Sequence, residues 1–381
     1  MAGVYVHIPF CGQFCTYCNF YSVKGKEYRE KYIKALHKEI EHRKYFFDNT
    51  GVAPQTIYFG GGTPSVFSPH ILGEILNKII QAFGISPSEV SIEVNPNDIT
   101  PQYAKELHNE GFNRVSMGIQ SFVDDHLTWM NRRHKAIEGE EAFYNLRNAG
   151  FNNISLDLIF GYNPLSDELW EYNLAKITEL SPEHISAYQM SIEPGSALGK
   201  LYENGKYELL PDNICHNQYS TMQQFLGKKG YFQYEISNFA KRDTATGKLL
   251  KSMHNSSYWT KEPYIGLGPA AHSYNGQMRL WNKNSVSGYC KHYLAETPLA
   301  GIFGSYEELS ERDIFNESIM LGLRTVAGVD TSNLNQAFLR EIKGDIAYHC
   351  SLGNLIAEGD KIKIPSNKLF VSDGIIRDLF V

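Results

Sequence analysis

Three cysteines lie close together near the start of the chain. Cys11, Cys15 and Cys18 fall within the stretch HIPFCGQFCTYCNFYS (residues 7–22), and the other three cysteines lie far downstream. Three thiols cannot all pair with one another in disulfides, and the rest of the sequence does not resemble a secreted, disulfide-rich domain. The three thiolates therefore indicate a metal centre.

Two kinds of metal centre are compatible with three clustered thiolates. A closed zinc site needs a fourth ligand, which His7 or a distant cysteine would supply only by an unusual spacing. With zinc, the protein would be a zinc-stabilised binding module whose C-terminal domain recognises a partner protein. A cubane [4Fe-4S] cluster held by three thiolates instead leaves one iron open to an outside ligand. The open iron is the feature that could do chemistry.

The bulk composition limits the classes of partner. The chain has 381 residues, of which 42% are hydrophobic and 13% aromatic, enough for the core of a large domain and a small one. The start, MAGVYVHIPF, does not resemble a signal peptide, and no run of about 18 apolar residues occurs. We therefore expect a cytoplasmic protein without a transmembrane segment. The net charge of -6 argues against a nucleic-acid partner.

Strands and helices alternate through the first part of the chain. Apolar runs predict strands at 4–8, 56–59, 90–94, 114–119, 154–160 and 184–190. Helical periodicity follows at 28–40, 71–83, 137–148, 168–180 and 214–228. Ser68-Pro69 and Thr100-Pro101 each place a hydroxyl at an N-cap and proline at the first helical position.

This alternation predicts parallel strands joined by right-handed crossovers. The three clustered cysteines follow the first predicted strand, GGGTP follows the second and EVNP the third. The carboxyl ends of strands are where α/β barrels build their sites. We therefore predict an α/β fold in which residues 1–230 form a partial, open (β/α)6 barrel.

The remainder of the chain reads differently. Residues 231–305 are rich in glycine and aromatic residues with little periodicity, which predicts an extension packed on the barrel. Residues 306–381 predict a small winged-helix-like α+β domain, with a capping box at Ser310–Asp313 and strands at 361–364 and 369–371. Acidic residues outnumber basic ones there, so DNA binding by this domain is disfavoured.

The cysteine spacing C-x3-C-x2-C, with Tyr17 just before the third cysteine, resembles the radical S-adenosylmethionine (SAM) superfamily. The resemblance implies that SAM chelates the open iron and that an electron from the cluster breaks its sulfonium bond, giving a 5′-deoxyadenosyl radical. GGGTP at residues 60–64, one strand after the cysteines, supports this because glycines let the backbone approach a ligand closely.

Further motifs are similar to the coproporphyrinogen III oxidase-like branch of that superfamily and span almost the whole chain. They are YVHIPFC, GGGTPS, EVNP, SMGIQSF, the pair Arg132 and His134, SLDLIFG, YEISNFA, HNSSYW and MLGLRT. Carried over motif by motif, the resemblance implies SAM contacts from Tyr5, Tyr17, Gly61, Gly62, Thr63, Glu93, Gln120, Arg132, Asp157 and Ser191. The carboxylates among them suit ribose hydroxyls and a positive sulfonium.

Within this branch the chain is closest to the haem chaperone (HemW) group. The oxygen-independent coproporphyrinogen oxidases have a further cysteine two positions after the third and a longer N-terminal arm, whereas Phe20 stands at that position and the first strand starts at about Val4. HNSSYW, residues 254–259, resembles the HNxxYW motif associated with haem. It implies His254 as an axial ligand, with Tyr258 and Trp259 against the macrocycle. The alternative is a solvated or backbone-bonded loop histidine and two anchors of the extension.

These observations leave two functional hypotheses. The first is a radical SAM haem chaperone that carries a [4Fe-4S] cluster, binds SAM and haem, and delivers haem to an acceptor haemoprotein. The second is oxygen-independent oxidative decarboxylation of coproporphyrinogen III to protoporphyrinogen IX. Either would use an electron donor of the flavodoxin or ferredoxin type, and any membrane contact would be peripheral, through an acceptor. No catalytic residue is assigned beyond the cofactor contacts, so enzymatic turnover remains open.

Overall fold

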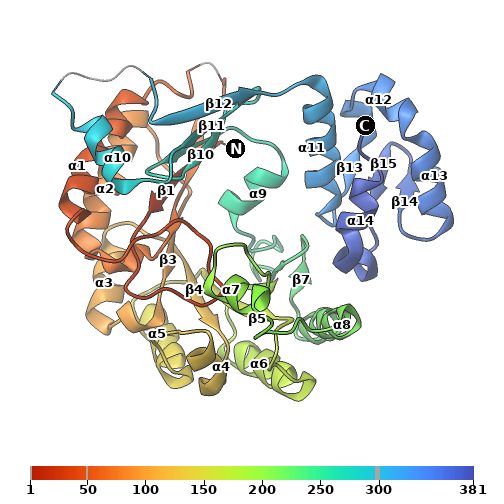
Figure 1. Cartoon of the computed structure of the whole chain (residues 1–381), viewed down its shortest axis with the longest axis horizontal. Coiled ribbons are helices and arrows are strands. Elements are labelled where there is room, and N and C mark those ends of the chain that lie inside the picture. The colour runs from red at the N-terminus through yellow and green to blue at the C-terminus, as the bar shows by residue number, and fades with distance from the viewer. Residues whose placement is uncertain (1, 49, 297–300) are drawn as a thin grey trace.

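Six parallel strands form the centre of the fold and follow one another in chain order (Figure 1). The computed structural model describes residues 2–48, 50–296 and 301–381. The strands are β1 (Ala2–Ile8), β2 (Pro54–Gly61), β3 (Glu89–Val94), β4 (Arg114–Gln120), β5 (Ile154–Phe160) and β6 (His184–Gln189). Their mostly buried side chains are typical of parallel strands covered on both faces. The predicted partial (β/α)6 barrel is confirmed.

Helices follow each of these strands, and most of them cover the outside of the barrel (Figure 1). They are α1 (Arg29–His42), α2 (Pro69–Phe83), α3 (Pro101–Asn109), α4 (Asp124–Trp129), α5 (Ala136–Asn148), α6 (Asp167–Leu180), α7 (Ala197–Glu203) and α8 (Asp212–Lys228). Both predicted N-caps are present, since Ser68 Oγ accepts from the Ile71 N–H and Thr100 Oγ1 from the Tyr103 N–H. Helices α4 and α7 were not predicted, because they have only 6 and 7 residues.

The stretch predicted as an irregular extension adds strands to both edges of the barrel sheet. β9 (Tyr264–Leu267) pairs parallel with β1, and β10 (His272–Tyr274), β11 (Met278–Asn282) and β12 (Gly304–Glu308) continue outward from it as antiparallel strands. At the other edge, β8 (Asn238–Ala240) pairs antiparallel with β6 and with β7 (Phe232–Gln233). Helices α9 (Met253–Trp259) and α10 (Val286–Tyr293) lie between these strands in sequence. Strands this short carry too few residues to show alternation.

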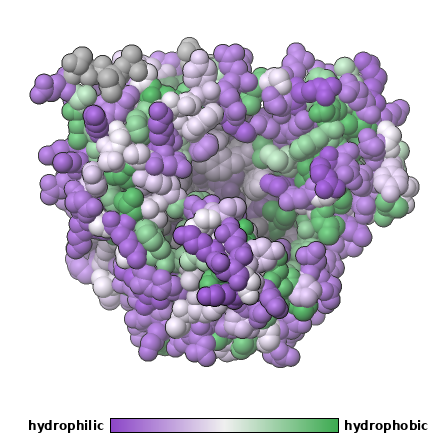
Figure 2. Space-filling view, viewed as in Figure 1, coloured by the Kyte–Doolittle hydropathy of each residue, from purple (hydrophilic) through white to green (hydrophobic). Residues whose placement is uncertain are grey.

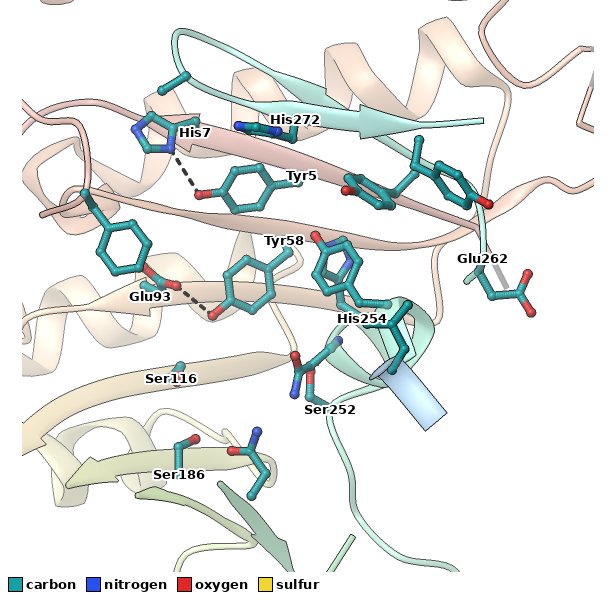
Figure 3. A pocket seen from close by; sticks show the side chains of 18 of the residues that line it. Tyr5, His7, Tyr58, Glu93, Ser116, Ser186, Ser252, His254, Glu262 and His272 are labelled. Atoms are coloured by element: carbon teal, nitrogen blue, oxygen red, sulfur yellow. Dashed lines mark hydrogen bonds between the residues drawn. The ribbon is translucent and has the colours of Figure 1, made fainter. Parts of the chain in front are cut away.

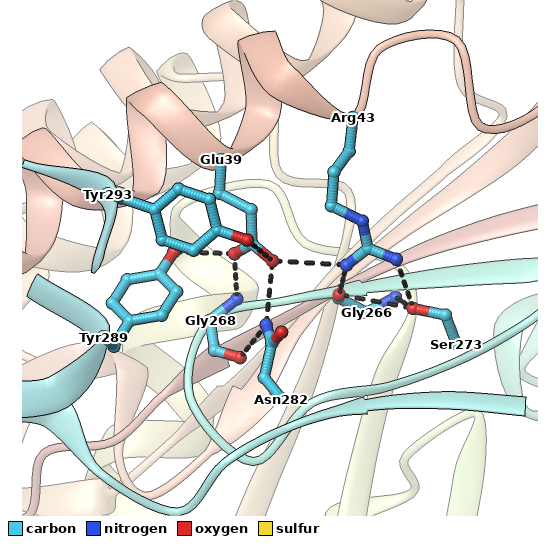
Figure 4. A network of polar contacts seen from close by, with 8 residues as sticks. All are labelled: Glu39, Arg43, Gly266, Gly268, Ser273, Asn282, Tyr289 and Tyr293. Atoms are coloured by element: carbon cyan, nitrogen blue, oxygen red, sulfur yellow. Dashed lines mark hydrogen bonds and ion pairs between the residues drawn. The ribbon is translucent and has the colours of Figure 1, made fainter. Parts of the chain in front are cut away.

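A buried carboxylate ties this extension to the barrel (Figure 4). Glu39 on α1 has no exposed surface and forms an ion pair with Arg43, at 3.2 Å. Its oxygens also accept hydrogen bonds from the Gly268 N–H at 2.7 Å, Asn282 Nδ2 at 2.8 Å and the Tyr289 hydroxyl at 2.6 Å. One side chain of the first helix therefore holds three separate segments of the extension in place.

The C-terminal part forms a small α+β unit with a three-stranded antiparallel sheet, ordered β13–β15–β14. Its elements are α11 (Glu311–Leu323), β13 (Val329–Asp330), α12 (Gln336–Glu341), α13 (Lys343–Ser351), β14 (Ile356–Glu358), β15 (Lys361–Lys363) and α14 (Ser372–Arg377). The predicted capping box of Ser310 and Asp313 is present. No helix of the described ranges is long and apolar enough to cross a membrane.

One predicted strand of this unit is wrong. Residues 369–371 belong to a 3-10 helix, Ser366–Val371, and the strand that pairs with β15 is β14 instead. Leu369 is fully buried, and the Phe370 ring contacts His216 and Tyr219 of α8. The apolar run therefore packs against the barrel, and a run of three residues cannot distinguish that role from a strand.

Candidate functional site

The three clustered cysteines lie on the loop that follows β1, at the carboxyl end of the strand. The loop is fixed to its surroundings by backbone bonds, from the Cys11 N–H to the Val23 carbonyl at 3.1 Å and from the Thr16 N–H to the Met130 carbonyl at 3.1 Å. Two side chains from other loops donate to the sulfurs. Thr63 Oγ1 lies 3.5 Å from Cys11 Sγ, and Arg132 Nη1 lies 3.4 Å from Cys15 Sγ.

These sulfurs fit a cluster better than a single ion. Burial raises the pKa of the Cys18 thiol to about 11, with added repulsion from Cys15 and Cys11, so the three sulfurs are near enough to interact. Neither the three cysteines nor any other group of three or more His, Cys, Asp or Glu side chains in the described ranges is arranged around a single metal ion. A closed zinc site requires four such ligands. Three thiols without a fourth ligand match the donor set of a cluster with one open iron.

A small cavity of ≈ 110 Å³ is bordered by the same Thr63 and Arg132 that reach the sulfurs. It brings together six of the ten predicted SAM residues, drawn from the loops and ends of four strands. They are Gly62, Thr63, Glu93, Gln120, Arg132 and Asp157. Val94, Asn95, Ser116 and Gly118 complete its lining. Parallel strands put their carboxyl ends at one edge of a sheet, which is why residues so distant in sequence meet here.

Glycine is required beside this cavity for two different reasons. Gly61 has a φ of +108°, which side chains rarely adopt, and its N–H donates to Glu93 Oε2 at 3.2 Å. Gly62 passes so close to the cysteine loop that a Cβ there would lie 2.7 Å from the Phe10 carbonyl oxygen. The GGGTP turn therefore brings backbone groups against both the cavity and the cluster loop.

Two carboxylates in this small cavity have raised pKa values. Burial raises the pKa of Glu93 to about 7 and that of Asp157 to about 6. The Tyr58 hydroxyl donates to Glu93 Oε1 at 2.8 Å, and Ser116 Oγ donates to Asp157 Oδ1 at 3.2 Å. Both groups keep free lone pairs that can accept from ligand hydroxyls.

A second and larger cavity of ≈ 660 Å³ adjoins the first, and Glu93 and Ser116 border both. The face drawn in Figure 2 is hollowed near its centre, over α9. Figure 3 shows side chains from the barrel and the extension pointing into the large cavity. Its lining includes Tyr5, His7, Tyr58, Arg114, His184, His254, Tyr258, Lys261, Tyr264, His272, Arg279 and Glu317. Tyr5, predicted as a SAM contact, lies here and donates to His7 Nδ1 at 3.1 Å.

His254 is a buried residue of α9, and not the solvated loop histidine of the alternative interpretation. It is 1% exposed, and both ring nitrogens are hydrogen-bonded, Nδ1 with Thr56 Oγ1 and Nε2 with the Tyr258 hydroxyl, each at 2.8 Å. Glu89 accepts from the Met253 and His254 N–H groups at the start of the helix. Burial lowers the pKa of His254 to about 3, so the imidazole is neutral at physiological pH.

The remaining predicted contacts lie elsewhere. Trp259 borders neither of these two cavities, and its buried indole N–H has no hydrogen-bond partner in the described part of the chain. Ser191 is exposed and also lies outside both. Tyr17 is partly buried beside Cys15 and Arg132. Burial raises the pKa of Tyr17 strongly, and the positive charge of Arg132 lowers it in part.

Sequence reasoning missed Tyr58, Arg114 and Ser116. For Arg114 and Ser116 the available signal was strand alternation, because every second residue from Arg114 leads along β4 to the predicted Gln120.

The fold and the site define a radical SAM protein. Residues 5–174 match the family model of the radical SAM superfamily. The chain is 33% identical to the haem chaperone HemW of Bacillus subtilis over 350 residues, which cover 90% of this chain and 89% of that protein. It is 28% identical to HemW of Mycobacterium tuberculosis H37Rv, over 99% of this chain and 94% of that one. The chain belongs to the HemW family of radical SAM proteins.

The structure is also similar to that of the coproporphyrinogen III oxidase HemN from Escherichia coli. The TM-score is 0.82 at 21% identity, over all of this chain and 90% of that one. At this identity the similarity establishes the shared fold and carries no conclusion about the reaction.

Proposed function

We propose that the protein is a haem chaperone that holds haem in the large cavity and passes it to an acceptor haemoprotein. The observation that carries the proposal is the ≈ 660 Å³ cavity, which is lined by His254 and several tyrosines and shares Glu93 and Ser116 with the small cavity beside the cysteines. Relatives named haem chaperones match the chain almost end to end, which supports it.

The large cavity has the size and lining for a porphyrin. Cavities for small organic ligands measure about 300–1,000 Å³. Tyr58 stacks on the His254 ring, with centroids 5.1 Å apart, and Tyr258 packs edge-on against Tyr264 at 4.7 Å, giving flat aromatic surface for a macrocycle. The neutral His254 imidazole is the form that binds iron. Because the Tyr258 hydroxyl oxygen lies 2.8 Å from Nε2, iron can bind there only when the Tyr258 ring moves away.

SAM is proposed to bind across the small cavity and the adjoining end of the large one, which meet at Glu93 and Ser116. A cluster held by Cys11, Cys15 and Cys18 would supply the electron that breaks the sulfonium bond of that ligand. This chain's residues hold and orient it: Glu93 and Asp157 accept from the ribose hydroxyls, while Gly62 and Thr63 keep backbone close to the ligand. Arg132 spans the Cys15 sulfur and the Gly118 carbonyl, which lies 2.7 Å from Nη2, and so fixes the cluster loop against β4.

The partners follow from this chemistry. An acceptor haemoprotein takes the haem, and an electron donor of the flavodoxin or ferredoxin type reduces the cluster. Three thiols that must stay unpaired require a reducing compartment, so we place the protein in the cytoplasm.

Haem titration after anaerobic reconstitution tests the proposal. We expect the wild-type protein to bind haem stoichiometrically, with an absorption spectrum of histidine-ligated iron. The His254→Ala variant should lose that spectrum and bind haem more weakly, whereas His272→Ala, at the wall of the same cavity, should keep it.

Two outcomes contradict the proposal. An unchanged spectrum and affinity in His254→Ala would remove His254 as the ligand. Failure of the wild-type protein to bind haem, together with accumulation of protoporphyrinogen when it is given SAM, a reductant and coproporphyrinogen III, would favour the oxidase reaction instead.

A further inference from the structure

The wall of the large cavity contains a buried positive charge that no carboxylate neutralises. Arg114, at the start of β4, is only 2% exposed and lines the cavity. Its Nε hydrogen has no hydrogen-bond partner, and within the described ranges no carboxylate lies at ion-pair distance from the guanidinium. A charge left in this state is costly, so an arginine here calls for an anionic partner.

The other two cations of the same wall are already engaged. Arg279 Nη2 pairs with Glu317 Oε1 at 2.7 Å. Lys261 Nζ donates to the Ile314 carbonyl and to Ser318 Oγ, each at 3.0 Å. Neither Arg114 nor Lys261 forms an ion pair in the described ranges, but the Lys261 ammonium is held by two neutral acceptors, and Arg114 is the more deeply buried of the two.

The groups around Arg114 cannot serve as its counter-ion. His184 is hydrogen-bonded to Ser155 Oγ at 2.7 Å and to the Tyr234 hydroxyl at 2.8 Å. Burial lowers the pKa values of His184 and His254, and the charge of Arg114 lowers them further, so both are neutral. Asp157 interacts with Arg114 at longer range and is bound by serine hydroxyls. None of these groups therefore forms an ion pair with Arg114, although Glu93, Glu262 and Glu317 also line the cavity.

We propose that Arg114 binds a carboxylate of the ligand in the large cavity, which, on the proposed function, is a propionate of haem. A guanidinium matches a carboxylate in two parallel hydrogen bonds, and the buried setting makes that pair selective for a charged group. The porphyrin then enters with a propionate edge toward β4 and its iron toward α9. The pair forms without any covalent or redox step.

The test compares haem with its dimethyl ester, which keeps the iron and the macrocycle but lacks both charges. We expect the wild-type protein to bind haem about 10- to 100-fold more tightly than the ester, as for a charge-assisted buried hydrogen bond. Arg114→Met should remove this preference and Arg114→Lys should keep part of it. The control, Arg147→Met, replaces an arginine outside both cavities and should retain it in full.

Iron-free protoporphyrin IX separates the two proposals. Its affinity should fall in Arg114→Met by the same factor as that of haem, and should not change in His254→Ala, because it has no iron to ligate. The Arg114 proposal fails, while the proposed function stands, if the wild-type protein binds haem and its ester equally. It also fails if the preference for haem over the ester persists in Arg114→Met. If the wild-type protein binds none of these porphyrins, both the proposed function and the assignment of Arg114 are wrong.

Discussion

The Nε2 atom of His254 lies 2.8 Å from the hydroxyl oxygen of Tyr258, so a phenol occupies the nitrogen that would ligate haem iron. Ligation on the proposed function must break this hydrogen bond. We expect Tyr258→Phe to bind haem roughly fivefold more tightly than the wild-type protein, since a net hydrogen bond is worth about 1 kcal/mol. Titration followed at the haem absorption band measures it. Weaker binding by Tyr258→Phe would indicate that the hydroxyl itself contacts the ligand.

The three clustered cysteines should each be necessary for the cluster. Replacing Cys11, Cys15 or Cys18 by serine should reduce iron after anaerobic reconstitution from about four atoms per chain to a small remainder, because no fourth ligand compensates. Cys350→Ser in α13, far along the chain from the loop, provides the control and should keep full iron and sulfide content. Full iron content in any of the three loop variants would contradict the assignment.

Glu93 should make the stability of the cofactor-free protein depend on pH. Its pKa is about 7 in the folded chain, above the ordinary value of 4.5. Between these values the folded state holds a proton that the unfolded state loses, so Glu93 stabilises at low pH and this contribution disappears as pH rises through about 7.

Glu93→Gln removes that dependence and keeps one acceptor oxygen, which can serve Tyr58 or Gly61 but not both. At pH 8 the variant should be more stable than the wild-type protein by about 1–3 kcal/mol, and near pH 4.5 the two should differ little. Urea denaturation at both pH values measures the difference, with Glu171→Gln on the exposed side of α6 as control. An equal gain at both pH values would be inconsistent with ionisation of Glu93.

Glu39 should be one of the most important buried polar residues for stability. Glu39→Leu leaves Arg43 charged and buried and removes the acceptor of Gly268, Asn282 and Tyr289, which predicts a loss of about 3–5 kcal/mol. Because those segments carry part of the large cavity's wall, haem affinity should fall as well. Exposed Glu41, paired with Lys44 and Lys78, offers the matched control, and Glu41→Leu should leave the thermal unfolding temperature nearly unchanged.

The barrel and the small cavity were predictable from sequence because their signals are local. Apolar runs marked the six central strands, and hydroxyl-proline pairs marked the starts of two helices. The resemblance to the radical SAM superfamily, carried over motif by motif, implied Gly62, Glu93 and Asp157. These features depend on neighbouring residues and on the geometry of parallel strands.

The rest depends on tertiary pairing that no local pattern records. Strand β9 has four residues and exists because β1 offers an edge to pair with. His254 is buried because α9 docks on β1 and β2, which the polar letters HNSSYW conceal. Arg114 stands in an apolar strand pattern as one charged letter, and only the structure shows that its charge lacks a partner.

The pairing of β1 with β9 joins residues 3–6 to residues 264–267. The second edge of β1 is therefore covered only when a segment far along the chain is in place. Until then the apolar edge of β1 is unpaired and open to association with other chains, and the cysteine loop follows directly from this strand. Closure of the sheet edge beside the cysteine loop thus depends on a segment that lies beyond the barrel in the sequence.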